Sequence, residues 1–177
     1  MSGIVGVTRE SQYSAANLLL YGLYALQHRG QETAGIGVLE GNEIHIKKGT
    51  GIVSSIFRED VLSSLPGNRG VGHVKYGEYL DYDFRQPILP EEFKIRGQSC
   101  LLALDGNVLN KDFSLFEMAK ALSGSIEQTK EYLSKLKGSF AGIYLDRYKM
   151  VAFRDQVGLK PICVGRFEDG YIFASET

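Results

Sequence analysis

The feature that most constrains the fold is an apolar run that begins almost at the N-terminus. Gly3-Ile4-Val5-Gly6-Val7 follows Met1-Ser2 directly and is compatible with a short buried strand. A strand that starts there places Ser2 inside the fold. The last third of the chain is also typical of strands, which we expect over residues 140–145, 150–154, 162–164 and 171–174.

Helix signals and one hairpin signal lie between these strands. Ser14 can cap a helix that extends to about residue 28 and that Gly30 ends. Residues 35–40 and 43–48 predict a hairpin, because the Gly41-Asn42 pair between them tolerates a positive φ angle. Residues 55–65 predict a short helix, and residues 71–76 predict a strand that ends at Gly77.

The centre of the chain combines a loop, a strand and two capped helices. Residues 79–98 have no clear hydrophobic period, so we expect an extended surface loop. Residues 101–104 predict a buried strand. Capping boxes then open two helices, Ser114 with Glu117 and Ser125 with Gln128. Strands at both ends with helices between them predict a layered α+β architecture.

Composition limits the class of function. The 177 residues, 44% of them hydrophobic, suit one globular domain over residues 1–177. Lys plus Arg (20) nearly balance Asp plus Glu (21), which argues against nucleic acid or an anionic membrane as a partner. The chain has neither a long apolar run nor a basic leader followed by an apolar one, so we expect a cytoplasmic protein. Small molecules or proteins are the expected partners, and neither a cofactor nor a metal is expected.

Two strings in the first quarter of the chain point to a family. Gln27-His28-Arg29-Gly30-Gln31, within residues 21–36, and the opening residues 1–6 closely resemble the glutaminase domain of amidophosphoribosyltransferases, which are class-II glutamine amidotransferases. The resemblance implies the four-layer αββα sandwich of the N-terminal-nucleophile hydrolases. Residues 154–161 and 171–176 resemble two later signatures of that sandwich. No phosphoribosyltransferase domain is expected within the chain.

The same resemblance implies a set of site residues, several of which depart from the family pattern. The family nucleophile is a cysteine after the initiator Met, and here it is Ser2. Arg29 and Gly30 match the loop that borders the nucleophile and the glutamine. Lys75, followed by Tyr76, stands where the family has an arginine that clamps the glutamine α-carboxylate. A lysine cannot reproduce the bidentate grip of a guanidinium.

The residues at the positions that bind the oxyanion and the glutamine ammonium group in the family differ further from the family pattern. Asp105 replaces an asparagine that, with the glycine corresponding to Gly106, donates hydrogen bonds to the oxyanion. An ionised aspartate can only accept hydrogen bonds, although Asp105-Gly106 could also serve simply as a turn pair. Gly77-Glu78 replaces a Ser-Thr pair and brings a carboxylate toward the expected anion site. Asp112 is the only nearby candidate to anchor the glutamine ammonium.

Three interpretations of Ser2 follow: a silent serine, a working nucleophile and an engineered replacement of cysteine. A nucleophile of this family uses its own α-amine as the base, so Met1 must be removed first. The leading hypothesis is a stand-alone amidotransferase-like domain, degenerate as a glutaminase, that binds an anionic small molecule at Arg29 and Lys75 or a partner such as a synthase. The alternatives are an active amidohydrolase or glutaminase that uses Ser2, and a regulatory subunit.

Overall fold

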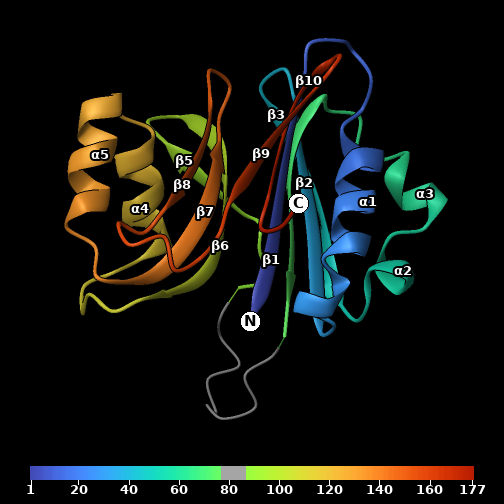
Figure 1. The fold of residues 1–177 in the computed structure, drawn as a ribbon. Helices are drawn as coiled ribbons and strands as arrows, with labels where there is room; N and C mark the ends of the chain where they lie inside the picture. Colours follow the sequence, from blue (N-terminus) through green and yellow to red (C-terminus); the bar gives the residue numbers. More distant parts are fainter. Residues whose placement is uncertain (77–86) are drawn as a thin grey trace.

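The computed structural model describes residues 1–76 and 87–177 and shows a sandwich of four layers (Figure 1). Two antiparallel sheets face each other, with α1, α2 and α3 outside one sheet and α4 and α5 outside the other (Figure 1). This arrangement confirms the predicted α+β class and the αββα sandwich.

The first sheet joins the two ends of the chain. Its strand order is β3-β2-β4-β1-β10-β9, so that β1 lies near the centre, between β4 and β10. Val5 of β1 pairs with Ala174 of β10, and Ser2 pairs with Lys75 of β4. The strands are β1 (Ser2–Arg9), β2 (Thr33–Glu40), β3 (Glu43–Thr50), β4 (Arg69–Lys75), β9 (Cys163–Phe167) and β10 (Gly170–Ala174).

Side chains of β1 point alternately to the two faces of the sheet, and each face belongs to a different hydrophobic core. Val5 and Val7 face outward and pack with Leu19 and Leu23 of α1 (Ala16–Ala25). Ile4 faces inward and belongs to the core that fills the space between the sheets. Ser2 has the same parity as Ile4, and therefore points between the sheets as the sequence predicts.

The second sheet has the order β5-β6-β7-β8 and is covered by two helices. Its strands are β5 (Glu91–Ile95), β6 (Gln98–Val108), β7 (Gly138–Leu145) and β8 (Met150–Arg154), and its helices are α4 (Leu115–Leu122) and α5 (Ile126–Ser134). The capping box predicted at Ser125 and Gln128 is complete. At α4, Ser114 Oγ accepts a hydrogen bond from the Glu117 backbone N–H, as predicted for its cap.

Three sequence predictions need correction. Helix α1 ends at Ala25, and a 3-10 turn, η1 (Gln27–Arg29), follows it. Gly30 has an extended φ of −172°, so it is not a left-handed helix stop. The predicted helix over residues 55–65 is two short ones, α2 (Val53–Ile56) and α3 (Glu59–Leu62), because Phe57 between them is extended and buried against the outer core.

The third correction concerns the expected loop over residues 79–98. Residues 91–95 form β5, which pairs with β6 through a turn at Arg96 and Gly97, where φ is 52° and 81°. Gly77, Glu78 and the remainder of that loop to residue 86 lie outside the described residues. The Gly41-Asn42 hairpin between β2 and β3 forms as predicted.

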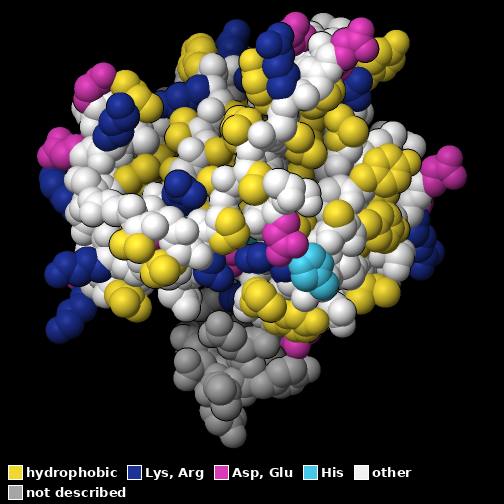
Figure 2. All heavy atoms as spheres, in the orientation of Figure 1, with side chains coloured by type: hydrophobic (Ala, Val, Ile, Leu, Met, Phe, Trp, Pro, Cys, Tyr) yellow, Lys and Arg dark blue, Asp and Glu magenta, His cyan; other side chains and the backbone are white. Residues whose placement is uncertain are grey.

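Two general features of the molecule agree with its composition. Lys and Arg side chains are interspersed with Asp and Glu side chains over the face shown in Figure 2. In the part of the chain that the structure describes, no helix is both long and apolar enough to cross a membrane.

Candidate functional site

Ser2 and Asp105 meet between the two sheets. The Ser2 hydroxyl donates a hydrogen bond of 2.6 Å to Asp105 Oδ1, although the two residues are 103 positions apart. Ser2 is 5% exposed and Asp105 is fully buried. Since β1 and β6 belong to opposite sheets, this contact exists only because the sandwich closes. The hydroxyl is thereby oriented toward a carboxylate.

Arg29 is the centre of the site and is itself buried. Its Nε donates to the Ser2 carbonyl oxygen at 2.8 Å, and its Nη2 donates to Asp105 Oδ2 at 3.0 Å. Its Nη1 donates to Glu176 Oε1 at 2.7 Å. The guanidinium therefore joins the first strand, the second sheet and the C-terminal end of the chain.

Backbone pairing brings Glu176 to this place. Beyond the end of β10, the Ser175 backbone N–H donates to the Ile4 carbonyl, and Ser175 Oγ accepts from the Ile4 N–H at 3.0 Å. Glu176 also lies 3.0 Å from His28 Nε2. Hydrogen bonds from Arg29 first, and then from His28, lower the pKa of Glu176. His28 thus supports the ion pair from the exposed side.

Lys160 supplies a second cation to Asp105. Its Nζ lies 3.3 Å from Asp105 Oδ1, and its side chain is 23% exposed. The loop that carries Lys160 is shaped by Asp155, whose carboxylate accepts hydrogen bonds from five backbone N–H groups, those of Phe140, Val157, Gly158, Leu159 and Lys160. Burial alone raises the pKa of Asp155, but these donors bring it below its usual value.

A small pocket opens beside this ion-pair cluster. It has a volume of about 130 Å³ and is lined by Met1, Lys75, Gly106, Asn107, Ser139 and Lys160. Ser2 and Asp105 are outside this lining, and so is Arg29. Of the two cations expected to form a positive pocket, only Lys75 lines this one, beside Lys160, because Arg29 is directed at two carboxylates.

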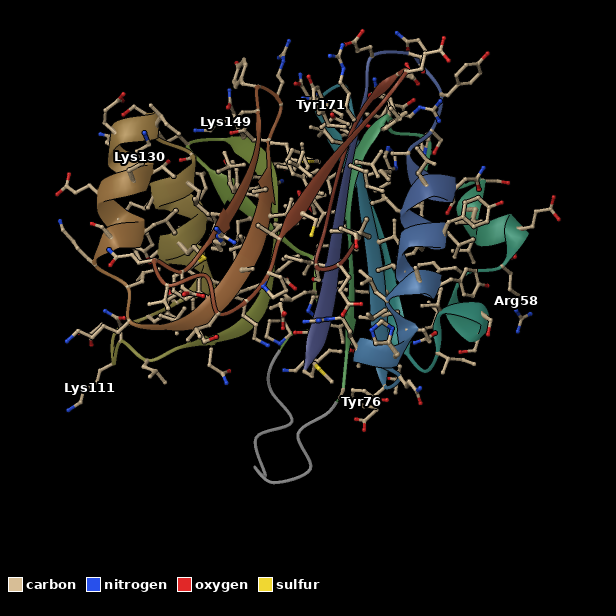
Figure 3. The ribbon with its side chains drawn as sticks, in the orientation of Figure 1. Arg58, Tyr76, Lys111, Lys130, Lys149 and Tyr171 are labelled. Carbon is tan, nitrogen blue, oxygen red and sulfur yellow. The ribbon has the colours of Figure 1, made fainter. Side chains whose placement is uncertain are left out.

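Glycines allow the backbone to approach closely on both sides of this pocket. A Cβ atom at Gly30 would collide with the backbone of Lys75, so this position requires a glycine for packing. Gly106 has a φ of 99°, and a Cβ there would collide with the Ser139 carbonyl. Tyr76 lies at the end of β4, at the edge of the sandwich where the N-terminus also lies (Figures 1 and 3).

The structure therefore brings most of the predicted site residues together. Ser2, Arg29 and Asp105 are in direct contact, while Lys75 and Gly106 line the adjoining pocket. Asp112 is exposed and is not part of that lining. Sequence reasoning missed Lys160 and Glu176, since it assigned their strings to the fold alone. The charge on Lys160 in the first string and on Glu176 in the second could have indicated a place in the site.

His73 is a buried titratable group next to the site. It is 1% exposed, and neither ring nitrogen meets hydrogen-bond geometry with a described residue. Burial lowers the pKa of His73 from 6.5 to about 4, although the nearby Asp105 carboxylate and Leu104 backbone favour the protonated form. The imidazole is consequently neutral at pH 7.

This neutral imidazole predicts a loss of stability in mild acid. Between pH 6.5 and pH 4 the unfolded chain binds a proton that the folded chain does not bind, so the free energy of unfolding falls as the pH falls. From about pH 7 to about pH 5 the expected contribution is about 2 kcal/mol. Urea unfolding at both pH values measures it, and His73→Leu removes this part of the pH dependence. An unchanged slope in His73→Leu contradicts the assignment.

Sequence comparisons relate the chain to known proteins. A glutamine amidotransferase domain profile matches residues 85–177. The amidophosphoribosyltransferase of Methanocaldococcus jannaschii is 31% identical over 204 residues, which cover 99% of this chain and 42% of that protein. The Bacillus subtilis amidophosphoribosyltransferase is 32% identical over 199 residues, which cover 99% and 41%. The chain thus spans about two fifths of the length of these relatives.

Solved structures agree with this relation. The glutamine phosphoribosylpyrophosphate amidotransferase from Bacillus subtilis, solved with ADP and GMP, has a TM-score of 0.80 and 29% identity over 99% of this chain and 42% of its own. A structure described as the allosteric regulatory enzyme of purine biosynthesis has a TM-score of 0.81 and 27% identity over the same shares. Both likenesses extend over nearly the whole chain.

Proposed function

Because this chain belongs to the glutamine amidotransferase domain family and is related to the amidophosphoribosyltransferases, we propose that it is a member with a silent glutaminase site. In this proposal the domain binds a small anionic molecule or a partner protein, such as a synthase that lacks its own glutaminase. The observation that carries the proposal is the hydrogen bond from the Ser2 hydroxyl to the buried Asp105 carboxylate.

The first argument concerns the nucleophile. A hydroxyl must lose its proton to attack an amide carbon, and in this family the α-amine of the same residue accepts that proton. With Met1 attached, the Ser2 nitrogen is an amide and cannot act as a base. The Met1 carbonyl also accepts a hydrogen bond of 3.0 Å from the Tyr76 N–H, so Met1 continues the pairing of β1 with β4. A serine placed in this way has no amine to activate it.

The second argument concerns the transition state. Attack on the amide places negative charge on its oxygen, and hydrogen-bond donors must stabilise that charge. Asp105 offers acceptors in this region, and its own charge is balanced by Arg29 and Lys160. A second negative charge beside a buried carboxylate is disfavoured electrostatically. The arrangement therefore stabilises the resting ion pairs in preference to an oxyanion.

One observation favours the alternative, an amidohydrolase that uses Ser2. Asp105 Oδ1 lies 2.6 Å from the Ser2 oxygen and could accept its proton as a general base. Against this role, protonation of Asp105 would weaken its ion pairs with Arg29 and Lys160, which are the contacts that hold the carboxylate in place. The silent site therefore remains the proposal that the geometry supports better.

Glutamine hydrolysis by the purified chain tests the proposal. We expect ammonia release from glutamine to be no faster with the natural sequence than with Ser2→Ala, because Ser2 capped by Met1 has no amine base and Asp105 replaces one of the two oxyanion donors. A coupled ammonia assay measures the rate, and intact-mass analysis establishes whether Met1 is present. Robust turnover that Ser2→Ala abolishes would overturn the proposal.

A covalent probe distinguishes the amidohydrolase. If Ser2 is a working nucleophile, protein without Met1 forms an adduct at Ser2 with an electrophilic amide analogue, and peptide mass analysis locates that adduct. Protein that retains Met1 and remains unmodified supports the silent site. Co-purification of a synthase with the tagged chain from its own cells addresses the partner-binding form of the proposal.

A further inference from the structure

The outer face of α1 carries no charged side chain. The helix buries its leucines against the first sheet, and its opposite side exposes Asn17, Tyr21, Tyr24 and Ala25, which recur at helical spacing. A surface helix usually turns charged residues to water on that side. Charged residues make up 23% of this chain, yet none lies within residues 11–28. The composition of this face is therefore that of a contact surface and not that of a solvated helix.

Two tyrosines dominate the exposed side of α1. Tyr21 is 66% exposed and Tyr24 is 43% exposed. Within residues 1–76 and 87–177, neither side chain has a hydrogen bond or a ring contact. Apolar side chains gather on this part of the surface, at the right of Figure 2, over the place of α1 in Figure 1. Tyrosine is enriched at protein interfaces because its ring is apolar and its hydroxyl forms hydrogen bonds.

The uncharged surface continues from α1 onto α2. The Val53 backbone N–H donates a hydrogen bond of 2.8 Å to the Gln27 side-chain oxygen, which ties α2 to the turn that follows α1. Ile52, just before α2, is 46% exposed, and the two exposed residues within α2 are Ser54 and Ser55. The surface without charge is thus wider than a single helix.

The rim of this surface carries charges of both signs. Arg58, Glu59 and Asp60 are consecutive and exposed where α3 begins, and Arg58 points away from the sandwich in Figure 3. A second copy related by a twofold axis can therefore bring a carboxylate to face the cation of the first copy. An uncharged centre with a polar rim is the usual anatomy of a protein interface.

The centre of the surface also suits a second copy of the chain. Residues close to a twofold axis meet their own copies. A lysine or an aspartate there would meet a like charge, which is unfavourable. A tyrosine hydroxyl both donates and accepts hydrogen bonds, so Tyr21 can pair with Tyr21 of another copy. The face of α1 is therefore complementary to itself.

We propose that two copies of this chain associate through the outer face of α1 and the adjoining α2, about a twofold axis that passes close to Tyr21. A standard interface buries about 800 Å² per partner. At ~200 Å² for a whole tyrosine, Tyr21 and Tyr24 together expose roughly 200 Å², so the contact must extend over α2 to the rim at α3. This face lies outside the sandwich, and the dimer is expected whether or not the chain hydrolyses glutamine.

Light scattering coupled to size-exclusion chromatography tests the dimer with the whole chain. At about 100 µM the natural chain should have the mass of two copies, and dilution should return it to one. Tyr21→Glu should weaken association about tenfold or more, because its carboxylate meets a second carboxylate near the axis. Tyr148→Glu is the matched control: it changes a tyrosine that is 70% exposed in the β7–β8 turn, and it should leave the dimer unchanged.

A charge-reversal pair tests the twofold axis. Tyr21→Glu mixed with Tyr21→Lys should form a heterodimer, because opposite charges then meet near the axis. A tag on one of the two variants identifies that heterodimer by its mass, and circular dichroism verifies that each variant is folded. A monomeric natural chain would mean that something other than a second copy covers α1, and would overturn the proposal. Equal losses in Tyr21→Glu and Tyr148→Glu, a dimer that Tyr21→Glu leaves intact, or no heterodimer in the mixture would also overturn it.

Discussion

The double variant Ser2→Cys and Asp105→Asn is expected to release ammonia from glutamine at least about 10²-fold faster than the natural chain, because one oxyanion donor alone is worth about 10²–10³ in rate. A thiol loses its proton far more readily than a hydroxyl. The amide of asparagine has the shape of the carboxylate, but it carries N–H donors and no charge. The pair of changes therefore supplies both a nucleophile and a donor.

The structure indicates that this double variant still folds. Arg29 keeps its hydrogen bonds to the Ser2 carbonyl and to Glu176, and Lys160 is 23% exposed and can turn to water. An amide oxygen at position 105 can still accept a hydrogen bond from Arg29. Thermal unfolding followed by circular dichroism verifies that the variant is folded before its activity is compared.

The single variants are the controls for this prediction. Ser2→Cys alone should remain nearly inactive, since the Asp105 carboxylate still opposes the oxyanion. Asp105→Asn alone should also gain little, because a hydroxyl loses its proton far less readily than a thiol and is the poorer nucleophile. The rates are compared at high glutamine concentration, on protein shown by intact mass to lack Met1. If Ser2→Cys alone matches the double variant, Asp105 does not limit glutamine hydrolysis at this site.

Much of the fold could be predicted from local sequence. The short apolar run after Ser2, the Gly41-Asn42 turn and the Ser125 capping box each specify their element through local chemistry, and the structure agrees at all three places. The resemblance carried by residues 21–36 then supplied the layer order. These signals agree with one another, which is the condition under which a sequence specifies one fold.

The elements that were missed depend on partners distant in sequence. β5 is a strand because its residues pair with β6, and the Arg96-Gly97 turn that joins them has one residue that rarely adopts a positive φ. Gly30 was interpreted as a helix stop, whereas the backbone of Lys75 on a neighbouring strand is what requires a glycine there. A local pattern cannot reveal such approaches.

The same reasoning applies to the site. The structure brings Ser2, Arg29 and Asp105, which the family motifs singled out, into contact, but their roles depend on which atoms meet. The closure of the site by Lys160 and Glu176 follows from the loop shaped by Asp155 and from the pairing beyond β10. Each of these two contacts, Lys160 with Asp105 and Glu176 with Arg29, joins residues more than 50 positions apart, so no motif spacing encodes them.

The ion-pair cluster makes Asp105 a determinant of stability as well as of chemistry. Removing one partner of a buried ion pair leaves the remaining charges without compensation, at a typical cost of about 3–5 kcal/mol. Asp105 accepts hydrogen bonds from Ser2, Arg29 and Lys160, and it is fully buried. Asp105→Ala is therefore expected to lower the free energy of unfolding by about 3–5 kcal/mol, measured in urea at about pH 7.

A double-mutant cycle attributes this loss to the cluster. Lys160→Met should be destabilising in the natural chain but nearly neutral when combined with Asp105→Ala, because Lys160 then has no carboxylate to lose. Glu131→Ala, which breaks an exposed pair with Lys135 on α5, is the matched control, and its effect should be too small to resolve. A loss below about 1 kcal/mol in Asp105→Ala, or additive effects of the two changes, would show that Asp105 and Lys160 are not energetically coupled. The stability of the closed site would then have to come from packing between the sheets, and the proposed lack of glutaminase activity would need another explanation.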